Sequence, residues 1–153
     1  MAFRHLSEVL QLCHLHLQLD HSSIVGLLWY GSEAKLLYTD TDSLIYEIGA
    51  EDFYRDIAGD VETWFDTSEF DADHPSGIQT GVNKKVSGMI KDEAGGKIIQ
   101  EFVGLRAKQY SFKMWEDSSE HKRCKGIRKN VVVVKNKITH DDYKNCLLDD
   151  EER

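Results

Sequence analysis

The apolar residues within positions 1–30 have a spacing that fits a helix in one part and a strand in another. From residue 15 to residue 19 apolar and polar residues alternate strictly, as in a strand. Four other apolar positions recur every three or four residues, as on one face of a helix: Leu6, Leu10, Cys13 and Leu17. We interpret this segment as a helix, and Gly31 is a suitable residue for its C-terminal end.

Residues 35–48 contain two apolar runs around a short polar centre. The runs read KLLYT and SLIYEI, and the centre is Asp40-Thr41-Asp42. Two strand-like runs separated by a few polar residues are typical of a β-hairpin. The two aspartates are therefore expected at the turn of a hairpin.

An apolar stripe downstream of this hairpin predicts an amphipathic helix. Phe53, Ile57, Val61 and Trp64 fall near positions i, i+4, i+8 and i+11. We expect this helix to lie on a sheet. Trp64 and Phe65 should then belong to the core, and we do not interpret them as a stacking platform for bases.

Three strand-like runs and a short helix follow. The runs cover residues 84–91, 97–105 and 107–115, and a DEAGG turn joins the first two. Thr139, with Asp142 three residues later, resembles a helix N-cap followed by an acidic first turn. The predicted order is α, ββ, α, βββ, α, which is an α+β fold.

Charge changes sign across a loop that contains the only proline, Pro75. Residues 40–73 carry twelve Asp or Glu against one Arg, whereas residues 84–137 carry fourteen Lys or Arg against six acids. The net charge of −8 therefore does not exclude a nucleic-acid partner, because the basic block can meet phosphates. Around this loop we expect four parts, which are residues 1–73, a linker at 74–83, residues 84–115 and residues 116–153.

Composition limits the compartment and the redox chemistry. No apolar run approaches the roughly 20 residues of a membrane helix, and residues 1–30 lack the features of a signal peptide. We expect an intracellular protein that is not secreted and has no membrane partner. Cys13, Cys124 and Cys146 are far apart and form no CxxC pair, so we expect reduced and mostly buried thiols.

The polar centre of the hairpin carries the most specific chemistry. Two carboxylates one residue apart at a tight turn can bind a hard cation such as Mg²⁺ or Mn²⁺, which prefers oxygen ligands and retains water. A DxD alone is weak evidence, but here it stands within Tyr38-Thr39-Asp40-Thr41-Asp42-Ser43. This string, flanked by apolar runs, resembles the YxDTDS motif in the palm of family B DNA polymerases.

Further segments resemble the protein-primed branch of that family, in its order along the chain. KKVSG at 84–88 followed by KDE at 91–93 is similar to its KKxxG strand and turn, and GLRAKQY at 104–110 is similar to its LRxKxY segment. CKGI at 124–127 and the basic stretch after it look like the start of the thumb. The resemblance implies a partial palm, an antiparallel hairpin and sheet with packed helices, leading into a thumb-like β/α segment.

The resemblance implies a role for each matching residue. Asp42 aligns with the stricter metal-binding position and would be the main catalytic ligand of Mg²⁺ or Mn²⁺, assisted by Asp40. Lys108 and Tyr110 match the KxY element that touches the primer end of DNA, and in a strand both would project from one face. In the basic stretch beyond, the residues that we expect to contact DNA phosphates are Lys125, Arg128 and Lys129.

Parts of the family pattern are missing from this sequence. The second metal-binding aspartate of an upstream palm strand and the lysine-bearing KxxxNxxYG fingers helix are absent. We therefore expect a fragment of a DNA-directed DNA polymerase, such as a decaying or domesticated transposon-like element would leave, that is inactive alone. Its expected partners are DNA primer-template and deoxynucleotide triphosphates, with a priming terminal protein or the missing segments in trans.

Two other interpretations remain open. Asp40-Thr41-Asp42 would also suit a glycosyltransferase or a phosphatase of the haloacid dehalogenase type, although that phosphatase expects Thr or Val where Leu44 stands. A calcium loop is excluded because its pattern requires an acid or amide at position 44 and glycine at 45. The second alternative is a non-catalytic interaction protein that keeps the fold for binding.

Overall fold

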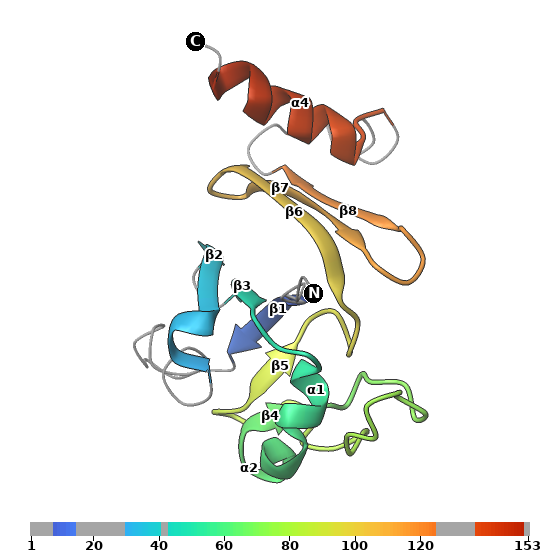
Figure 1. Ribbon diagram of the computed structural model, residues 1–153. Coiled ribbons are helices and arrows are strands. Elements are labelled where there is room, and N and C mark those ends of the chain that lie inside the picture. Colours follow the sequence, from blue (N-terminus) through green and yellow to red (C-terminus); the bar gives the residue numbers. More distant parts are fainter. Residues whose placement is uncertain (1–7, 15–29, 41–42, 125–136, 152–153) are drawn as a thin grey trace, which may run out of the picture. The chain divides into compact units, whose positions relative to one another are not determined.

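A computed structural model describes the backbone of residues 8–14, 30–40, 43–124 and 137–151 (Figure 1). The chain separates into two compact units, residues 1–98 and residues 99–153. The division thus falls after Ile98, whereas the sequence placed a linker at 74–83. Both units contain antiparallel strands and short helices, which confirms the α+β class.

The first unit is built on a sheet with the strand sequence β2, β3, β1, β5, β4. The hairpin strands β2 (Ala34–Asp40) and β3 (Ser43–Ile48) are antiparallel, as predicted. β3 also pairs with β1 (Glu8–His14), and β1 pairs with β5 (Ile90–Asp92), both in antiparallel fashion. A short strand, β4 (Phe65–Asp66), joins β5 in parallel. A 3₁₀ turn, Gly31–Glu33, precedes β2.

The helix predicted in the first thirty residues is wrong for residues 8–14, which form β1. This strand is paired on both sides, by β3 and by β5. The spacing of Leu10 and Cys13 fits a helix, whereas the alternation at residues 15–19, directly after β1, fits a strand. Pairing with two neighbouring strands, which satisfies the backbone polar groups of the segment, decides between them.

The amphipathic segment after β3 forms three short helical pieces instead of one helix. They are α1 (Phe53–Asp56), a 3₁₀ turn at Ala58–Asp60, and α2 (Val61–Trp64). Asp52 caps α1, because its side chain accepts a hydrogen bond from the amide of Arg55 at 3.0 Å. Gly59, a poor helix former, lies at the interruption.

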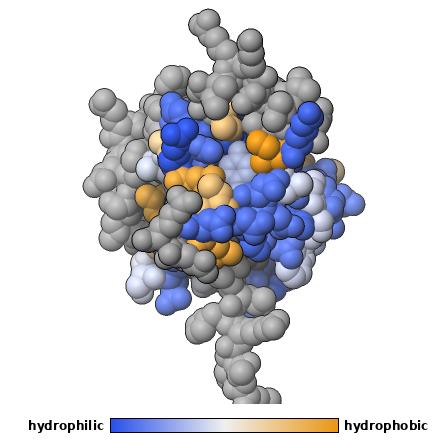
Figure 2. All heavy atoms as spheres, turned by 90° about the horizontal axis from the view of Figure 1, so that it is seen from above, coloured by the Kyte–Doolittle hydropathy of each residue, from blue (hydrophilic) through white to orange (hydrophobic). Residues whose placement is uncertain are grey.

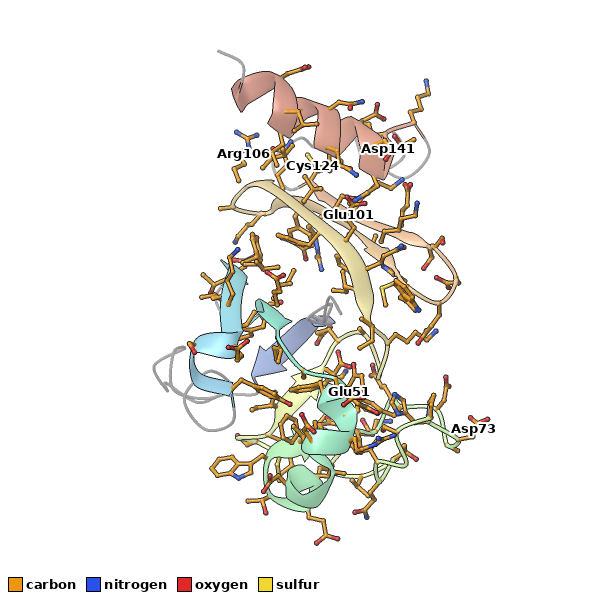
Figure 3. The ribbon with its side chains drawn as sticks, viewed as in Figure 1. Glu51, Asp73, Glu101, Arg106, Cys124 and Asp141 are labelled. Carbon is orange, nitrogen blue, oxygen red and sulfur yellow. The ribbon has the colours of Figure 1, made fainter. Side chains whose placement is uncertain are left out.

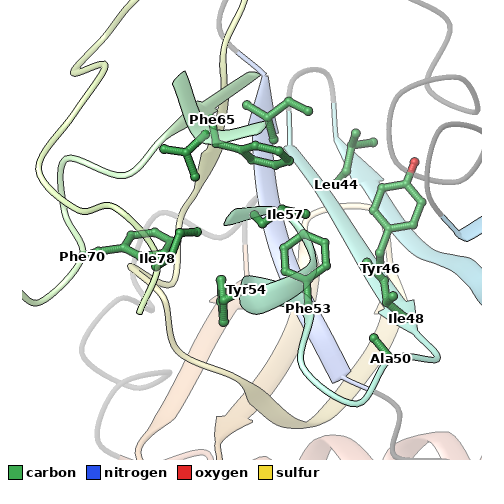
Figure 4. Packing of buried hydrophobic residues seen from close by; sticks show 12 residues of the cluster. Leu44, Tyr46, Ile48, Ala50, Phe53, Tyr54, Ile57, Phe65, Phe70 and Ile78 are labelled. Carbon is green, nitrogen blue, oxygen red and sulfur yellow. The ribbon is translucent and has the colours of Figure 1, made fainter. Parts of the chain in front are cut away.

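The apolar stripe nevertheless packs as predicted on one face of the sheet (Figure 4). Phe53, Ile57 and Val61 are each only 1% exposed. The prediction for Trp64 is wrong, because its side chain is 38% exposed, whereas Phe65 is buried as expected. The stripe meets the side chains of β3 that point to the same face, Leu44, Tyr46 and Ile48. Burial of each large apolar side chain contributes roughly 1.5–3 kcal/mol.

The segment expected to be a linker is packed onto this core. Ile78 is 5% exposed and belongs to the core cluster. The hydroxyl of Thr67 donates to the carbonyl of Gln79 at 2.9 Å, and Nδ2 of Asn83 donates to the carbonyl of Phe65 at 2.9 Å. The first bond satisfies a carbonyl of the loop that a free linker would leave to water, and the second ties the end of the loop to β4.

The strand predicted at residues 84–91 is mostly wrong. Residues 84–89 form turns and irregular backbone, and Lys85 and the preceding Asn83 have positive φ values of 56° and 59°. Only Ile90–Asp92 is a strand, and it pairs with β1 and β4. The DEAGG turn therefore does not close a hairpin between β5 and the next strand.

The second unit contains a three-stranded antiparallel sheet and the terminal helix. β6 (Ile99–Arg106) and β7 (Gln109–Met114) confirm the strands predicted at 97–105 and 107–115, and β8 (Glu120–Cys124) adds an edge. The helix α4 (His140–Glu151) confirms the predicted terminal helix. It lies on the face of the sheet that carries Glu101 (Figure 3).

The exposed surface seen in Figure 2 is largely hydrophilic, with apolar side chains in small groups. None of the described helices has the length and apolar character needed to span a membrane. The thiols differ from the prediction, because Cys146 is exposed and Cys124 is only partly buried.

Candidate metal turn and nucleic-acid interface

The β2–β3 hairpin positions one of the two predicted metal ligands. Asp40 is the last residue of β2 and pairs with Ser43, the first residue of β3. Only Thr41 and Asp42 separate these two residues, so the connection is a two-residue turn. Thr41 and Asp42 lie outside the described residues. The sequence spacing alone keeps the two carboxylates within one turn of each other.

The register of the sheet orients Asp40 away from the core. Ser43 is one residue before Leu44, and Leu44 points into the cluster around α1. Since successive side chains of a strand point to opposite faces, Ser43 and its partner Asp40 project from the other face. A register shift between Leu36 and Tyr38 marks a β-bulge in β2, a device that re-aims side chains near functional sites.

A row of residues runs across the whole sheet from Asp40. Ser43 pairs with Cys13, Cys13 with Lys91, and Lys91 with Asp66. Nζ of Lys91 lies 2.8 Å from Oε1 of Glu69, so this lysine forms an ion pair with the turn that follows β4. The carboxyl of Asp66 is buried and hydrogen-bonds to two backbone amides, those of Ser68 and Lys85, both at 2.9 Å.

The hydrogen bonds and the charge around Asp66 keep this buried carboxyl ionised. Burial works to raise its pKa, but the hydrogen bonds from Ser68 and Lys85, together with the charge of Lys91, lower the pKa below its ordinary value. Asp66 is therefore ionised and fastens the turn at Lys85 to β4.

The donor set of the hairpin suits a hard cation. Carboxylate and hydroxyl oxygens of Asp40 and Ser43 stand at one end of the hairpin, and oxygen is the ligand atom that Mg²⁺ and Mn²⁺ prefer. Within the ranges that the structure describes, no group of three or more His, Cys, Asp or Glu side chains is arranged to hold a metal ion. Any cation here would keep much of its water.

The KxY element is arranged differently from the prediction. Lys108 does not lie in a strand with Tyr110, but in the two-residue turn between β6 and β7, with a positive φ of 62°. Tyr110 lies in β7 and is 6% exposed, and Phe112 and Met114 continue its face along the strand. The same-face argument for Lys108 is therefore wrong, because the turn reorients the backbone before Gln109.

A row of rings extends from Tyr110 across the sheet. The ring centroid of Tyr110 lies 5.9 Å from that of Phe102 and 6.2 Å from that of Phe112. Phe112 in turn stacks on His121 of β8 at 4.8 Å with an interplanar angle of 11°. Gly104 is the partner of Tyr110 in β6, and an added Cβ there would lie 3.1 Å from the Phe102 ring. Glycine therefore leaves room for this ring.

The remaining residues predicted to contact DNA, Lys125, Arg128 and Lys129, lie outside the described residues. The structure describes the chain up to Cys124, at the end of β8, and again from Lys137.

Sequence reasoning missed Asp92, a buried carboxyl at the end of β5. The hydroxyl of Tyr54 donates to its Oδ2 at 2.7 Å, and the amides of Gly96 and Ala94 donate to Oδ2 and Oδ1, both at 2.8 Å. Burial raises the pKa of Asp92 to about 6, against the opposing effect of these hydrogen bonds. An aspartate three residues before Gly95-Gly96 was the available signal for such a turn.

A second missed cluster joins α4 to the sheet. Nδ1 of His140 hydrogen-bonds with Oγ of Ser111 at 2.9 Å, and its Nε2 lies 3.3 Å from Oε2 of Glu101 without hydrogen-bond geometry. Glu101 also pairs with Lys144, whose hydrogen bond is the main cause of the lowered pKa of Glu101. Ser111 and His140 are at most 1% exposed, so this Ser-His-Glu arrangement is closed to a substrate and serves packing.

A scan against protein-family models, a search of curated proteins and a search of solved structures each found no match to this chain.

Proposed function

We propose that this chain is a fragment of a family B DNA polymerase of the protein-primed type, from the end of the palm to the start of the thumb. The observation that carries the proposal is the YTDTDS string at a two-residue hairpin turn, with Asp40 ending β2 and Ser43 beginning β3.

The topology around the hairpin supports the proposal. β3 and β5 both run antiparallel to β1, and are therefore parallel to each other, with β1 between them. The chain connects β3 to β5 through α1 and α2, so the first unit contains a split βαβ arrangement with helices on one face. Asp40 and Ser43, at the end of the hairpin, project from the face opposite the helices.

Each part of the chain has a separate role in the proposal. Asp42 and Asp40 hold a divalent cation, which when bound screens the charge of the nucleotide triphosphate and activates the attacking oxygen. Lys108, at the turn, supplies a charge for the sugar-phosphate backbone next to Tyr110. The basic residues after β8, including Lys125, Arg128 and Lys129, add further phosphate contacts.

Paramagnetic broadening by Mn²⁺ tests the metal turn. In a ¹H-¹⁵N spectrum of the full chain, we expect Mn²⁺ to broaden the signals of residues 39–43 first, at weak affinity, because two carboxylates leave most of the coordination to water. Asp42→Asn should abolish this local broadening. Asp71→Asn, a change in an exposed acidic loop of the same unit, is the matched control and should leave it intact.

The outcomes separate the proposal from its rivals. Broadening that spreads over the acidic segment 40–73, or that survives Asp42→Asn, would mean that Mn²⁺ merely follows the net charge. In that case the hairpin would be an acidic turn and the metal role of Asp40 and Asp42 would be withdrawn.

A further inference from the structure

The described edge strand of the second unit, β8, presents a charged side chain directly beside Tyr110. Arg123 is the register partner of Tyr110, and His121 is the partner of Phe112. Directly opposed residues of antiparallel strands have Cα atoms about 4.5–5.5 Å apart, and their side chains share one face. Arg123 and His121 are both exposed.

The opposite face of the same strands is occupied by α4. Lys122, one residue before Arg123, donates from Nζ to the carbonyl of Ile138 at 2.7 Å, and Ser111 meets His140. Because side chains alternate along a strand, Arg123 projects from the face that α4 does not cover. The acidic first turn of α4, which contains Asp141 and Asp142, is therefore on the other side of the sheet from the Arg123 side chain.

The backbone at Arg123 is held in place from the covered side. The hydroxyl of Tyr143, which is 3% exposed, donates to the carbonyl of Arg123 at 3.3 Å. The guanidinium thus extends from an anchored strand, and it lies at the sheet end where the β6–β7 turn carries Lys108. A guanidinium offers a planar fork of donors that matches a phosphate in bidentate geometry.

We propose that Arg123 binds a backbone phosphate of the primer strand, next to the position of Tyr110, and that the exposed side chains of β8 continue the DNA-binding surface from the β6–β7 turn. The proposal rests on the proposed polymerase function and adds a contact that the sequence motif does not contain. Lys108, two residues before Tyr110, and Arg123, its register partner, would both stand next to Tyr110. His121, two residues from Arg123 on the same face, lies next along this edge.

The test uses the full chain with a fluorescent primer-template that has a recessed 3′ end. Arg123→Gln should weaken binding about tenfold near 0.1 M salt, and should flatten the slope of log affinity against log salt by about 0.9. Arg123→Lys should restore the slope, because it keeps the charge, but only part of the affinity. Arg55→Gln, which removes an exposed arginine of α1 in the first unit, is the matched control and should change neither.

Uncharged replacements of single primer phosphates identify the phosphate that Arg123 contacts. Single methylphosphonates are introduced in turn at the last few phosphates of the primer, and one of them should weaken binding by the unmodified chain. The same substitution should have no further effect on Arg123→Gln. A loss of equal size in both proteins at every position would overturn the phosphate contact of Arg123.

The remaining outcomes distinguish this inference from the proposed function. If the unmodified chain binds primer-template and Lys108→Gln weakens it, while Arg123→Gln behaves like Arg55→Gln, the inference fails and the proposed function stands. If the unmodified chain does not bind primer-template even at low salt, both fail. Matching circular dichroism spectra and melting temperatures of the variants exclude unfolding as the cause of a loss.

Discussion

Asp92 shows how a single side chain can make the fold of the first unit depend on pH. Its carboxyl connects the turn after β5 to Tyr54 of α1, and next to it the ring of His74 hydrogen-bonds with the carbonyl of Gly96 at 2.7 Å. The charged form of Asp92 is disfavoured by burial, so the folded protein holds this proton up to a higher pH than the unfolded chain does.

The sign of the resulting pH dependence follows from the raised pKa. The pKa of Asp92 rises from 3.8 to about 6 on folding. Its contribution to stability is therefore fully present below pH 4 and is lost as the pH rises through 6. The loss amounts to at most about 3 kcal/mol, since one pKa unit corresponds to 1.36 kcal/mol.

The variant Asp92→Asn tests this pH dependence of stability. The free energies of unfolding of both proteins are obtained from urea titrations between pH 4 and 7.5. The advantage of the unmodified chain over Asp92→Asn should shrink by up to about 3 kcal/mol across this range. A constant difference would show that the carboxyl of Asp92 has the same pKa in the folded and unfolded states.

At the scale of elements, helix α4 depends on a reciprocal cap. The amide and hydroxyl of Thr139 donate to Oδ2 of Asp142 at 2.7 and 2.9 Å, and the amide of Asp142 donates to the Thr139 hydroxyl at 3.2 Å. These bonds also lower the pKa of Asp142. Two backbone amides at the start of the helix are thereby satisfied.

Removal of this cap should loosen α4 specifically. Thr139→Ala is expected to destabilise the protein by about 1 kcal/mol, whereas Thr139→Ser, which keeps the hydroxyl, should have a small effect. Hydrogen exchange of the α4 amides, compared with that of the amides in β2 and β3, reports the change. Equal acceleration in both regions would contradict a local role of the cap.

A substitution in the β6–β7 turn separates an effect on stability from an effect on the proposed DNA binding. Lys108 has a left-handed φ of 62°, a conformation that costs a non-glycine residue roughly 1 kcal/mol. Lys108→Gly should therefore leave the melting temperature unchanged or slightly raised, while it weakens primer-template binding by removing a charge. A large fall in melting temperature, with binding lost in proportion, would mean that Lys108 acts through the fold.

At the scale of the whole molecule, the proposed activity requires more than these two units contain in the described residues. Nucleotidyl transfer by two metal ions needs carboxylates that clamp cations roughly 3.5–4 Å apart. The hairpin carries Asp40 and Asp42, and the described part of the sheet next to it shows no group of three such ligands. Positioning and electrostatics account for almost all of phosphoryl-transfer catalysis.

We therefore expect no DNA synthesis by this chain alone. Primer extension is assayed with template-primer, all four nucleotides and Mg²⁺ or Mn²⁺, beside an Asp42→Asn control. Extension by the unmodified chain that disappears in Asp42→Asn would show that the chain holds a complete site. Primer extension should appear when a second polypeptide that contains the upstream palm strand and the fingers helix is added.

Local patterns in the sequence were sufficient for features that depend on near neighbours. The β2–β3 hairpin, the β6 and β7 strands, the cap of α4 and the burial of Phe53, Ile57 and Val61 could all be predicted. Each follows from residue spacing or from bonds between residues a few positions apart, so the required information lies within one segment.

Only the tertiary structure decided the features that depend on distant partners. β1 is a strand because β3 and β5 flank it, although its spacing also fits a helix. Lys108 belongs to a turn because pairing of Arg106 with Gln109 leaves only two residues to reverse the chain, and Arg123 stands beside Tyr110 because of the β7–β8 register. Pairing energies between segments far apart in sequence set these positions, and no local pattern contains them.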